Sequence, residues 1–342
     1  MNSVSVVMAT FNGEKYIEQQ LESLSAQTRQ PDELIISDDG SADATLEIVG
    51  RFARRAGFPV RILQNGTRLG YGENFLSAAV LARSELVAFC DQDDIWHEAK
   101  LALCCQSFDD PAVSLCAHAA RLIDARGAEI GVFTQGIAKQ SVKPPLKLDP
   151  WGVFFGFSMV ARRNLLDIIP ASERGPDSHN VQGLAAHDRW VYVLGIACGQ
   201  TVLLPDLLVS YRQHGSNVYG RNQTGKLARA RKPLAEITAT AERYVRIAEH
   251  RHKMFLRASA QPHHDQRLRE FLRNAASAWE QVATGAERRL AVYRAPAGLG
   301  RATELLKNVL TGVYTDRSQG LMTSALVKDL STLVKRGGRS LD

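Results

Sequence analysis

The 342-residue sequence predicts an α/β fold that is built on a mainly parallel sheet. Within residues 1–90, short strand-like apolar runs alternate with longer segments of helical spacing, a pattern typical of βαβ units. Polar clusters follow three of these runs. Because ligands of parallel sheets bind at the carboxyl ends of the strands, we expect these clusters to meet in one site.

The first strand and helix are predicted over residues 3–9 and 14–27. Residues 3–9 are rich in Val, and a turn-forming Asn-Gly pair follows them. Apolar residues then recur at helical spacing until Pro31 stops the helix. Further strands are expected at 33–37, 60–64 and 85–90, and further helices at 44–56 and 73–82.

The remainder predicts a mixed region followed by helices. Gly152 and Gly156 lie among aromatic residues, which suggests a close approach of the backbone to something bound. Short strands are expected at 113–117, 158–161, 201–204 and 207–211, and a helix opens at 187–190. Helical patterns then cover 226–273, 304–310 and 321–334.

Charge divides the chain into two parts. Residues 224–342 hold 22 Lys and Arg against 11 Asp and Glu, a net charge of +11, whereas residues 1–223 hold 20 against 25. We therefore expect a catalytic domain over 1–220, a boundary near Gly220, and a basic, mainly helical C-terminal domain over 221–342.

Composition predicts a cytoplasmic protein. No apolar stretch reaches the length of a membrane span, and the first residues lack the pattern of a secretory signal. The five cysteines have no CxxC spacing and favour reduced core residues over a zinc site.

An acidic motif, Asp91-Gln92-Asp93-Asp94, follows the strand at 85–90. Three carboxylates so close together favour a hard divalent cation such as Mg²⁺ or Mn²⁺. The alternative is a solvated turn that caps the next helix, which we expect to begin near Trp96.

Four motifs together resemble the family 2 glycosyltransferases, which have the GT-A fold, a Rossmann-like mixed sheet that binds nucleotide-diphospho-sugars. These are the VVMATFNG run at 6–13, DDGSADAT at 38–45, DQDDIW at 91–96 and HDRW at 187–190, and the resemblance covers about residues 3–220. The resemblance implies an enzyme, a glycosyltransferase with an α-helical region after its GT-A domain. It also implies nucleotide-sugar contacts by Thr10, Phe11, Asn12, Asp39, Asn74, Asp91, Gln92, Asp93 and Arg212.

Further roles follow from the same resemblance. Asp93 is expected to ligate the cation against the diphosphate, with His214 completing the metal site. Asp188 matches the position of the catalytic base, although this chain has His187 where the family more often has Glu. The alternatives are an ordinary turn for Asp38-Asp39, an N-cap for Asp188, a helix-start signal for Asn74 and a structural role for His214.

The motifs DQDDIW and YRQHGSN resemble the bacterial rhamnosyltransferase-like branch of the family. That resemblance implies an inverting, metal-dependent transfer from dTDP-L-rhamnose to a glycan acceptor, in O-antigen or capsule synthesis. We expect a lipid-linked acceptor, such as a polyprenyl-diphosphate-linked glycan, and peripheral contact of the basic C-terminal helices with an anionic membrane. No nucleic-acid-binding motif is present, so nucleic acid is not an expected partner.

Four alternatives compete with this interpretation. A UDP-sugar-dependent enzyme of the same fold, or a homologue that binds nucleotide-sugar without turnover, would carry the same motifs. A sugar nucleotidyltransferase would show a Gly-rich phosphate loop with Arg after the first strand, and a dinucleotide oxidoreductase would show GxGxxG. Neither pattern occurs in residues 1–30.

Overall fold

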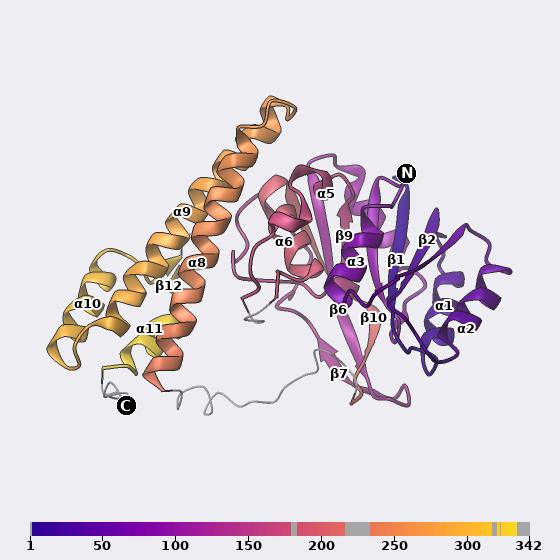
Figure 1. The fold of residues 1–342 in the computed structure, drawn as a ribbon, viewed down its shortest axis with the longest axis horizontal. Coiled ribbons are helices and arrows are strands. Elements are labelled where there is room, and N and C mark those ends of the chain that lie inside the picture. The colour runs from indigo at the N-terminus through magenta and orange to yellow at the C-terminus, as the bar shows by residue number, and fades with distance from the viewer. Residues whose placement is uncertain (1, 179–182, 216–232, 317–319, 322, 334–342) are drawn as a thin grey trace. The chain divides into compact units, whose positions relative to one another are not determined.

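The computed structural model describes residues 2–178, 183–215, 233–316, 320–321 and 323–333. The chain forms two compact units, one of residues 1–174 and 183–221 and the other of residues 175–182 and 222–342 (Figure 1). The predicted boundary near Gly220 lies outside the described residues.

The first unit is built on a mixed sheet with the strand order β3-β2-β1-β4-β9-β6-β10-β5. Its parallel half consists of β1 (Val4–Thr10), β2 (Glu33–Asp38), β3 (Val60–Gln64) and β4 (Leu86–Asp91). Its other half consists of β9 (Met159–Arg162), β6 (Val113–Ile123), β10 (Gln200–Arg212) and β5 (Ile95–Trp96). The predicted α/β fold is thereby confirmed.

Helices cover both faces of this sheet (Figure 1). Along β1, Val4, Val6 and Met8 are buried in one core cluster with residues of α1 (Ile17–Ser25), α2 (Thr45–Ala53) and α4 (Lys100–Gln106). The helices α3 (Tyr71–Ala79), α5 (Leu165–Ile168) and α6 (His187–Cys198) pack together, with α3 against β1 and β2 and α6 against β6. The alternation of side chains along a strand explains how one strand serves both layers.

The structure differs from the expected elements in three respects. The strands predicted at 201–204 and 207–211 form one strand, β10, whose register with β6 shifts between Leu204 and Leu207. This irregularity accommodates Pro205, which has no N–H to donate. The helix expected near Trp96 is wrong, because Trp96 lies in β5 and pairs with Val209, and α4 begins only at Lys100. Two further short strands, β7 (Glu129–Phe133) and β8 (Ser141–Lys143), extend the sheet.

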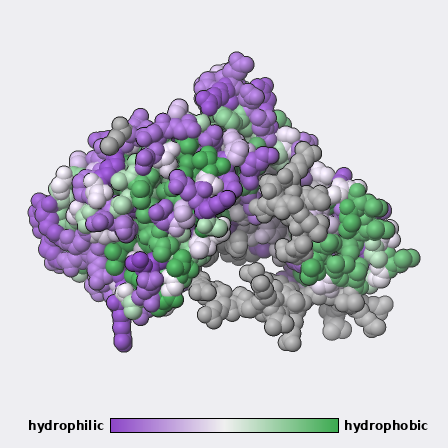
Figure 2. Space-filling model, turned by 180° about the vertical axis from the view of Figure 1, so that it is seen from behind, coloured by the Kyte–Doolittle hydropathy of each residue, from purple (hydrophilic) through white to green (hydrophobic). Residues whose placement is uncertain are grey.

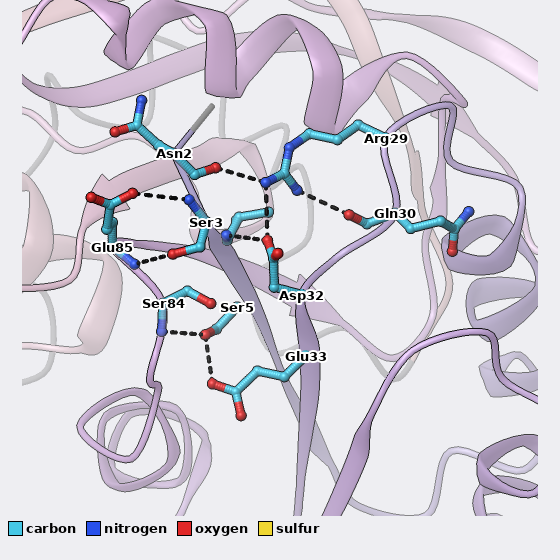
Figure 3. Close-up of polar contacts among 10 residues, drawn as sticks. Asn2, Ser3, Ser5, Arg29, Gln30, Asp32, Glu33, Ser84 and Glu85 are labelled. Atoms are coloured by element: carbon cyan, nitrogen blue, oxygen red, sulfur yellow. Dashed lines mark hydrogen bonds and ion pairs between the residues drawn. The ribbon is translucent and has the colours of Figure 1, made fainter.

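A polar network closes the amino-terminal edge of the sheet (Figure 3). Ser3 exchanges two hydrogen bonds with Glu85, and Ser5 Oγ donates to Glu33 at 2.7 Å. Asp32 accepts from the N–H of Val4 at 2.7 Å and from Arg29 at 2.9 Å. These bonds fix the register of β1 against its two neighbours at the end opposite the polar clusters.

The second unit is helical. Its helices are α8 (Leu234–Ser259), α9 (Gln266–Arg294), α10 (Leu299–Leu310) and α11 (Thr323–Leu330), and a small ladder joins β11 (Thr315–Asp316) to β12 (Gly320–Leu321). The helical run expected over 226–273 breaks after Ser259, where Pro262 follows and Asp265 caps α9 by accepting from Leu268 N at 2.7 Å. No helix in the described part of the chain is long and apolar enough to span a bilayer.

Candidate active site

The predicted polar clusters meet at the carboxyl edge of the parallel strands. Thr10 at the end of β1 lies in register with Asp38 at the end of β2, and Ala9 lies in register with Asp91 at the end of β4. The Thr10 hydroxyl donates to Asp38 Oδ1 at 2.8 Å. The first loop, the DDGS turn and the acidic motif therefore share one edge, as the sequence predicts.

Gln92 fastens the acidic motif to the first loop. Its Oε1 accepts from Phe11 N at 2.9 Å, and its Nε2 donates to Phe11 O at 3.0 Å. A Cβ at Gly13 would lie 2.3 Å from Gln92 Oε1, so only glycine fits there. The Arg68 guanidinium carbon lies 3.8 Å from the centroid of the Phe11 ring, and Asn12 is exposed.

Asp39 and Asn74 both organise the loop that precedes α3. The Asp39 carboxylate accepts from Leu69 N at 2.6 Å and from Gly70 N at 2.8 Å. Buried Asn74 donates to Ser37 O at 2.9 Å and accepts from Asn65, which also donates to Asp39. Contacts of Asp39 and Asn74 with a nucleotide stay predictions.

The acidic motif concentrates negative charge. Burial, followed by the charges of Asp93 and Asp188, raises the pKa of Asp91 to about 7. Burial, followed by the charges of Asp93 and Asp91, raises the pKa of Asp94 well above its ordinary value. Asp94 Oδ1 accepts from Arg212 N at 2.9 Å, while its buried Oδ2 has no partner. Asp94 therefore ties the motif to β10 and does not cap a helix.

Two residues at the end of β10 hold the motif. The buried Arg212 side chain donates from Nε to Asp93 O at 2.8 Å and from Nη2 to Gln19 at 2.7 Å. His214 Nε2 lies 2.8 Å from Asp93 Oδ2. The predicted pairing of His214 with Asp93 is thus present in the geometry, whereas contact of Arg212 with a diphosphate stays a prediction.

Asp93 and His214 offer one carboxylate and one imidazole nitrogen side by side, a donor pair that suits a divalent cation. Half-buried Asp91 adds a second carboxylate, because its pKa responds to the charge of Asp93. Within the described residues, no three His, Cys, Asp or Glu side chains are arranged as a complete metal site. The residues fit a cation that is completed by ligands from outside the chain, such as phosphate oxygens and water.

Asp188 lies in the first turn of α6, one residue after the helix begins. The N-cap is Ala186, and Asp188 Oδ1 accepts from the N–H of Arg189 at 2.6 Å, so the N-cap interpretation of Asp188 is wrong. A helix N-terminus favours the ionised carboxylate. Because the charge of Asp188 raises the pKa of Asp91, the two carboxylates lie in one electrostatic field.

The sequence did not predict that two basic residues, Lys100 and His187, are buried. Lys100 is fully buried, donates from Nζ to Phe157 O and lies 3.5 Å over the Trp96 ring. Burial lowers its pKa to about 8, and the charges of Asp94 and Asp91 oppose that shift. No local pattern signals such burial, because the contact joins residues far apart in the chain.

The second buried base is His187, which the sequence marks only as a departure from the family. Its ring stacks on Phe75 with centroids 4.1 Å apart, and burial lowers its pKa to about 3. A Cβ at Gly156 would lie 2.3 Å from His187 Nε2, so the backbone at Gly156 closely approaches this ring, and approach of this segment to something bound stays a prediction. Neither ring nitrogen has a hydrogen-bond partner.

Residues 5–167 match the family model described as Glycosyl transferase family 2. An uncharacterized protein of Mycobacterium tuberculosis, Rv1520, is 29% identical over 221 residues, which are 63% of this chain and 60% of that protein. The dTDP-rhamnosyl transferase RfbG of Shigella flexneri is 37% identical over 109 residues, 30% of this chain and 38% of RfbG. The chain thus spans less than two thirds of these relatives.

The crystal structure of Staphylococcus aureus TarS in complex with UDP-GlcNAc shares the fold. It aligns with a TM-score of 0.54 at 19% identity and covers 97% of this chain and 89% of that chain. The mixed sheet with helices on both faces and the helical C-terminal unit is therefore the GT-A-like arrangement that the sequence predicts. Residues 5–167 are accordingly similar to the glycosyltransferases of family 2.

Proposed function

We propose that the protein is a metal-dependent, inverting glycosyltransferase that uses a nucleotide-diphospho-sugar donor. The observation that supports this proposal is the contact of Asp93 with His214 at the carboxyl edge of the sheet, beside Asp91, whose pKa is raised by burial and then by the charges of Asp93 and Asp188. Such an arrangement brings a site for a diphosphate and its cation close to a carboxylate that can accept a proton.

Asp188 acts as the general base in this proposal. Its carboxylate takes the proton of the acceptor hydroxyl as that oxygen bonds to the anomeric carbon and the bond to the nucleoside diphosphate breaks. Asp188 lies in the first turn of α6, and a helix N-terminus favours the ionised form of a carboxylate, which suits a base. With one carboxylate assigned to a base and none to a nucleophile, a single displacement inverts the anomeric configuration.

Asp93 and His214 would hold Mg²⁺ or Mn²⁺, and Asp91 would lie on the ribose or in the cation's water shell. When bound, the cation neutralises charge that develops on the leaving diphosphate. Arg212 and Gln92 keep the motif in place through Asp93 O and the backbone of Phe11. Thr10, Phe11, Asn12 and Asp39 would line the base, and Asn74 would shape the donor-side loop.

The donor we propose is dTDP-L-rhamnose, with a UDP-sugar as the alternative. The similarity to RfbG, named a dTDP-rhamnosyl transferase, favours the first, and the fold shared with TarS, crystallised with UDP-GlcNAc, keeps the second. The acceptor would be a lipid-linked glycan of bacterial surface polysaccharide, such as O-antigen or capsule. The enzyme would then work in the cytoplasm, on the inner face of the cell membrane.

A donor screen tests this function. The protein is incubated with dTDP-L-rhamnose, UDP-GlcNAc, UDP-glucose or GDP-mannose, with Mn²⁺ or with a chelator, and release of the nucleoside diphosphate is measured. We expect metal-dependent release from dTDP-L-rhamnose and an α-linked product from its β-linked sugar. Release from UDP-sugars alone would exclude the rhamnose donor, a retained configuration would exclude inversion, and binding without release would favour a non-catalytic homologue.

A further inference from the structure

Helix α10 has an inverted distribution of side chains. An ordinary surface helix turns its apolar stripe toward the core. The buried residues of α10 are Arg301, Leu305 and Asn308, two of them polar. Its exposed residues include four large apolar ones, Leu299 (84% exposed), Leu306 (58%), Val309 (48%) and Leu310 (77%). Figure 2 shows a green, hydrophobic area in the region where Figure 1 places α10.

The inner face of α10 is held by specific polar contacts. Arg301 donates to Ala295 O at 3.1 Å and to Thr332 O at 2.8 Å, and Asn308 donates to Arg288 O at 2.9 Å. Leu305 joins the apolar core of the same unit. These contacts define which face of the helix points inward, so the outward position of the four apolar residues is a fixed property of this unit.

We propose that this outward face of α10, defined by Leu299, Leu306, Val309 and Leu310, inserts into the surface of an anionic membrane. This inference deepens the proposed function. It rests on that function in one respect, because a lipid-linked acceptor would make membrane attachment useful. A helix with an exposed apolar face in a basic setting lies in the plane of the interface, with its apolar side chains among the acyl chains.

Charge favours a membrane over a second copy of the chain. Residues 224–342 carry a net charge of +11, which attracts an anionic lipid surface and opposes close approach of two identical units. Lys307, on the same helix, is 62% exposed and pairs with Glu304 at 2.6 Å, and its long side chain can extend toward lipid headgroups. The four apolar residues also lie on one 12-residue helix, a small area for a stable dimer.

The test uses the full-length protein and vesicles that contain no glycan acceptor. Binding is measured by co-sedimentation with vesicles of phosphatidylcholine and phosphatidylglycerol, and with vesicles of phosphatidylcholine alone. The variant is Leu306→Glu with Leu310→Glu. Its matched control is Leu256→Glu, which alters a half-exposed leucine on α8 of the same unit. We expect binding to anionic vesicles to fall about tenfold or more in the double variant and to persist in the control.

A second variant reports insertion directly. In Leu310→Trp, the new indole should shift its fluorescence to shorter wavelength when anionic vesicles are added, because it enters an apolar environment. Equal vesicle binding by wild type and the double variant would overturn the proposal. So would a wild-type dimer that the double variant dissociates, or a lower unfolding temperature of the double variant without vesicles, which would mean that this chain itself covers the face. These outcomes are independent of the donor screen.

Discussion

At the scale of single residues, the site combines groups whose roles depend on charge with groups whose roles depend on burial. Asp93 and His214 are in contact through Oδ2 and Nε2 at 2.8 Å, and Asp91 and Asp94 share their electrostatic field. Lys100 is a buried cation close to the same carboxylates. The acidic motif thus has a resident positive charge beside it.

The first prediction concerns the metal. Asp93→Ala removes the carboxylate that pairs with His214, so Mn²⁺ should no longer strengthen binding of the nucleoside diphosphate, and transfer should be lost. Calorimetric titration with Mn²⁺ and with a chelator measures this effect. Asp109→Asn, at an exposed carboxylate of the same unit, serves as the control. Full activity of Asp93→Ala in a chelator would refute the metal assignment.

The second prediction concerns His187 and pH. Its pKa is about 3 in the folded protein and about 6.5 in an unfolded chain, so below pH 6.5 the unfolded chain binds a proton that the folded protein does not. The contribution that the pKa shift of His187 makes to the free energy of unfolding is therefore fully present above pH 6.5. It is lost as pH falls, by up to ~1.4 kcal/mol per pH unit, until pH approaches 3.

His187→Phe removes the titrating imidazole and keeps an aromatic ring against Phe75. Denaturant unfolding at several pH values should show that the variant gains stability relative to wild type as pH falls from 7 to 5. Parallel stability curves for the two proteins would show that the imidazole is not buried and neutral as described. The comparison isolates one ring, because the other titrating groups are the same in both proteins.

At the scale of elements, how well the sequence predicts depends on how local the pattern is. Apolar runs and the turn residues next to them in the chain predict the strand at 60–64 and where β1, β2 and β4 begin and end. The short strands β5, β7 and β8 escape prediction, because each forms only by pairing with a distant partner. For the same reason the sequence predicts a site at Asp91 to Asp94 but gives no sign of the buried Lys100, whose Nζ donates to the distant Phe157 O.

The third prediction concerns α11 in the helical unit. Its fully buried Asp329 accepts two hydrogen bonds of 2.8 Å from Arg289 and one of 2.8 Å from the Tyr314 hydroxyl, and Tyr293 also donates to it. Asp329→Asn removes the charge that balances Arg289. We expect a loss of about 3 kcal/mol in this unit, because the cation is left largely buried without its partner.

Hydrogen exchange of the α9 and α11 amides measures this loss without assuming that the whole chain unfolds at once. The matched control is Glu304→Gln, which breaks the surface pair with Lys307 and should cost less than about 1 kcal/mol. Equal protection of α9 and α11 in Asp329→Asn and wild type would contradict the role given to this network. Nucleotide binding should be unchanged in both variants, since the acidic motif belongs to the other unit.

At the scale of the whole molecule, the two units differ in composition as well as in architecture. The mixed-sheet unit carries every motif of the family resemblance, and residues 224–342 carry the excess of basic residues. Composition predicts this contrast but not where apolar side chains end up exposed. The basic residues Lys226, Arg229, Arg231 and Lys232 lie outside the described residues, whereas the apolar face of α10 appears only in the folded helix.

The most direct test of the account is the turnover of Asp188→Asn with the donor that the screen selects. The amide keeps the size of the carboxylate but cannot take the acceptor's proton, so we expect turnover to fall about 100-fold or more while affinity for the donor nucleotide stays the same. Asp167→Asn, which alters an exposed ion pair with Arg163 in the same unit, should keep full turnover. Undiminished turnover by Asp188→Asn would contradict the account, because the carboxylate would then not be the base.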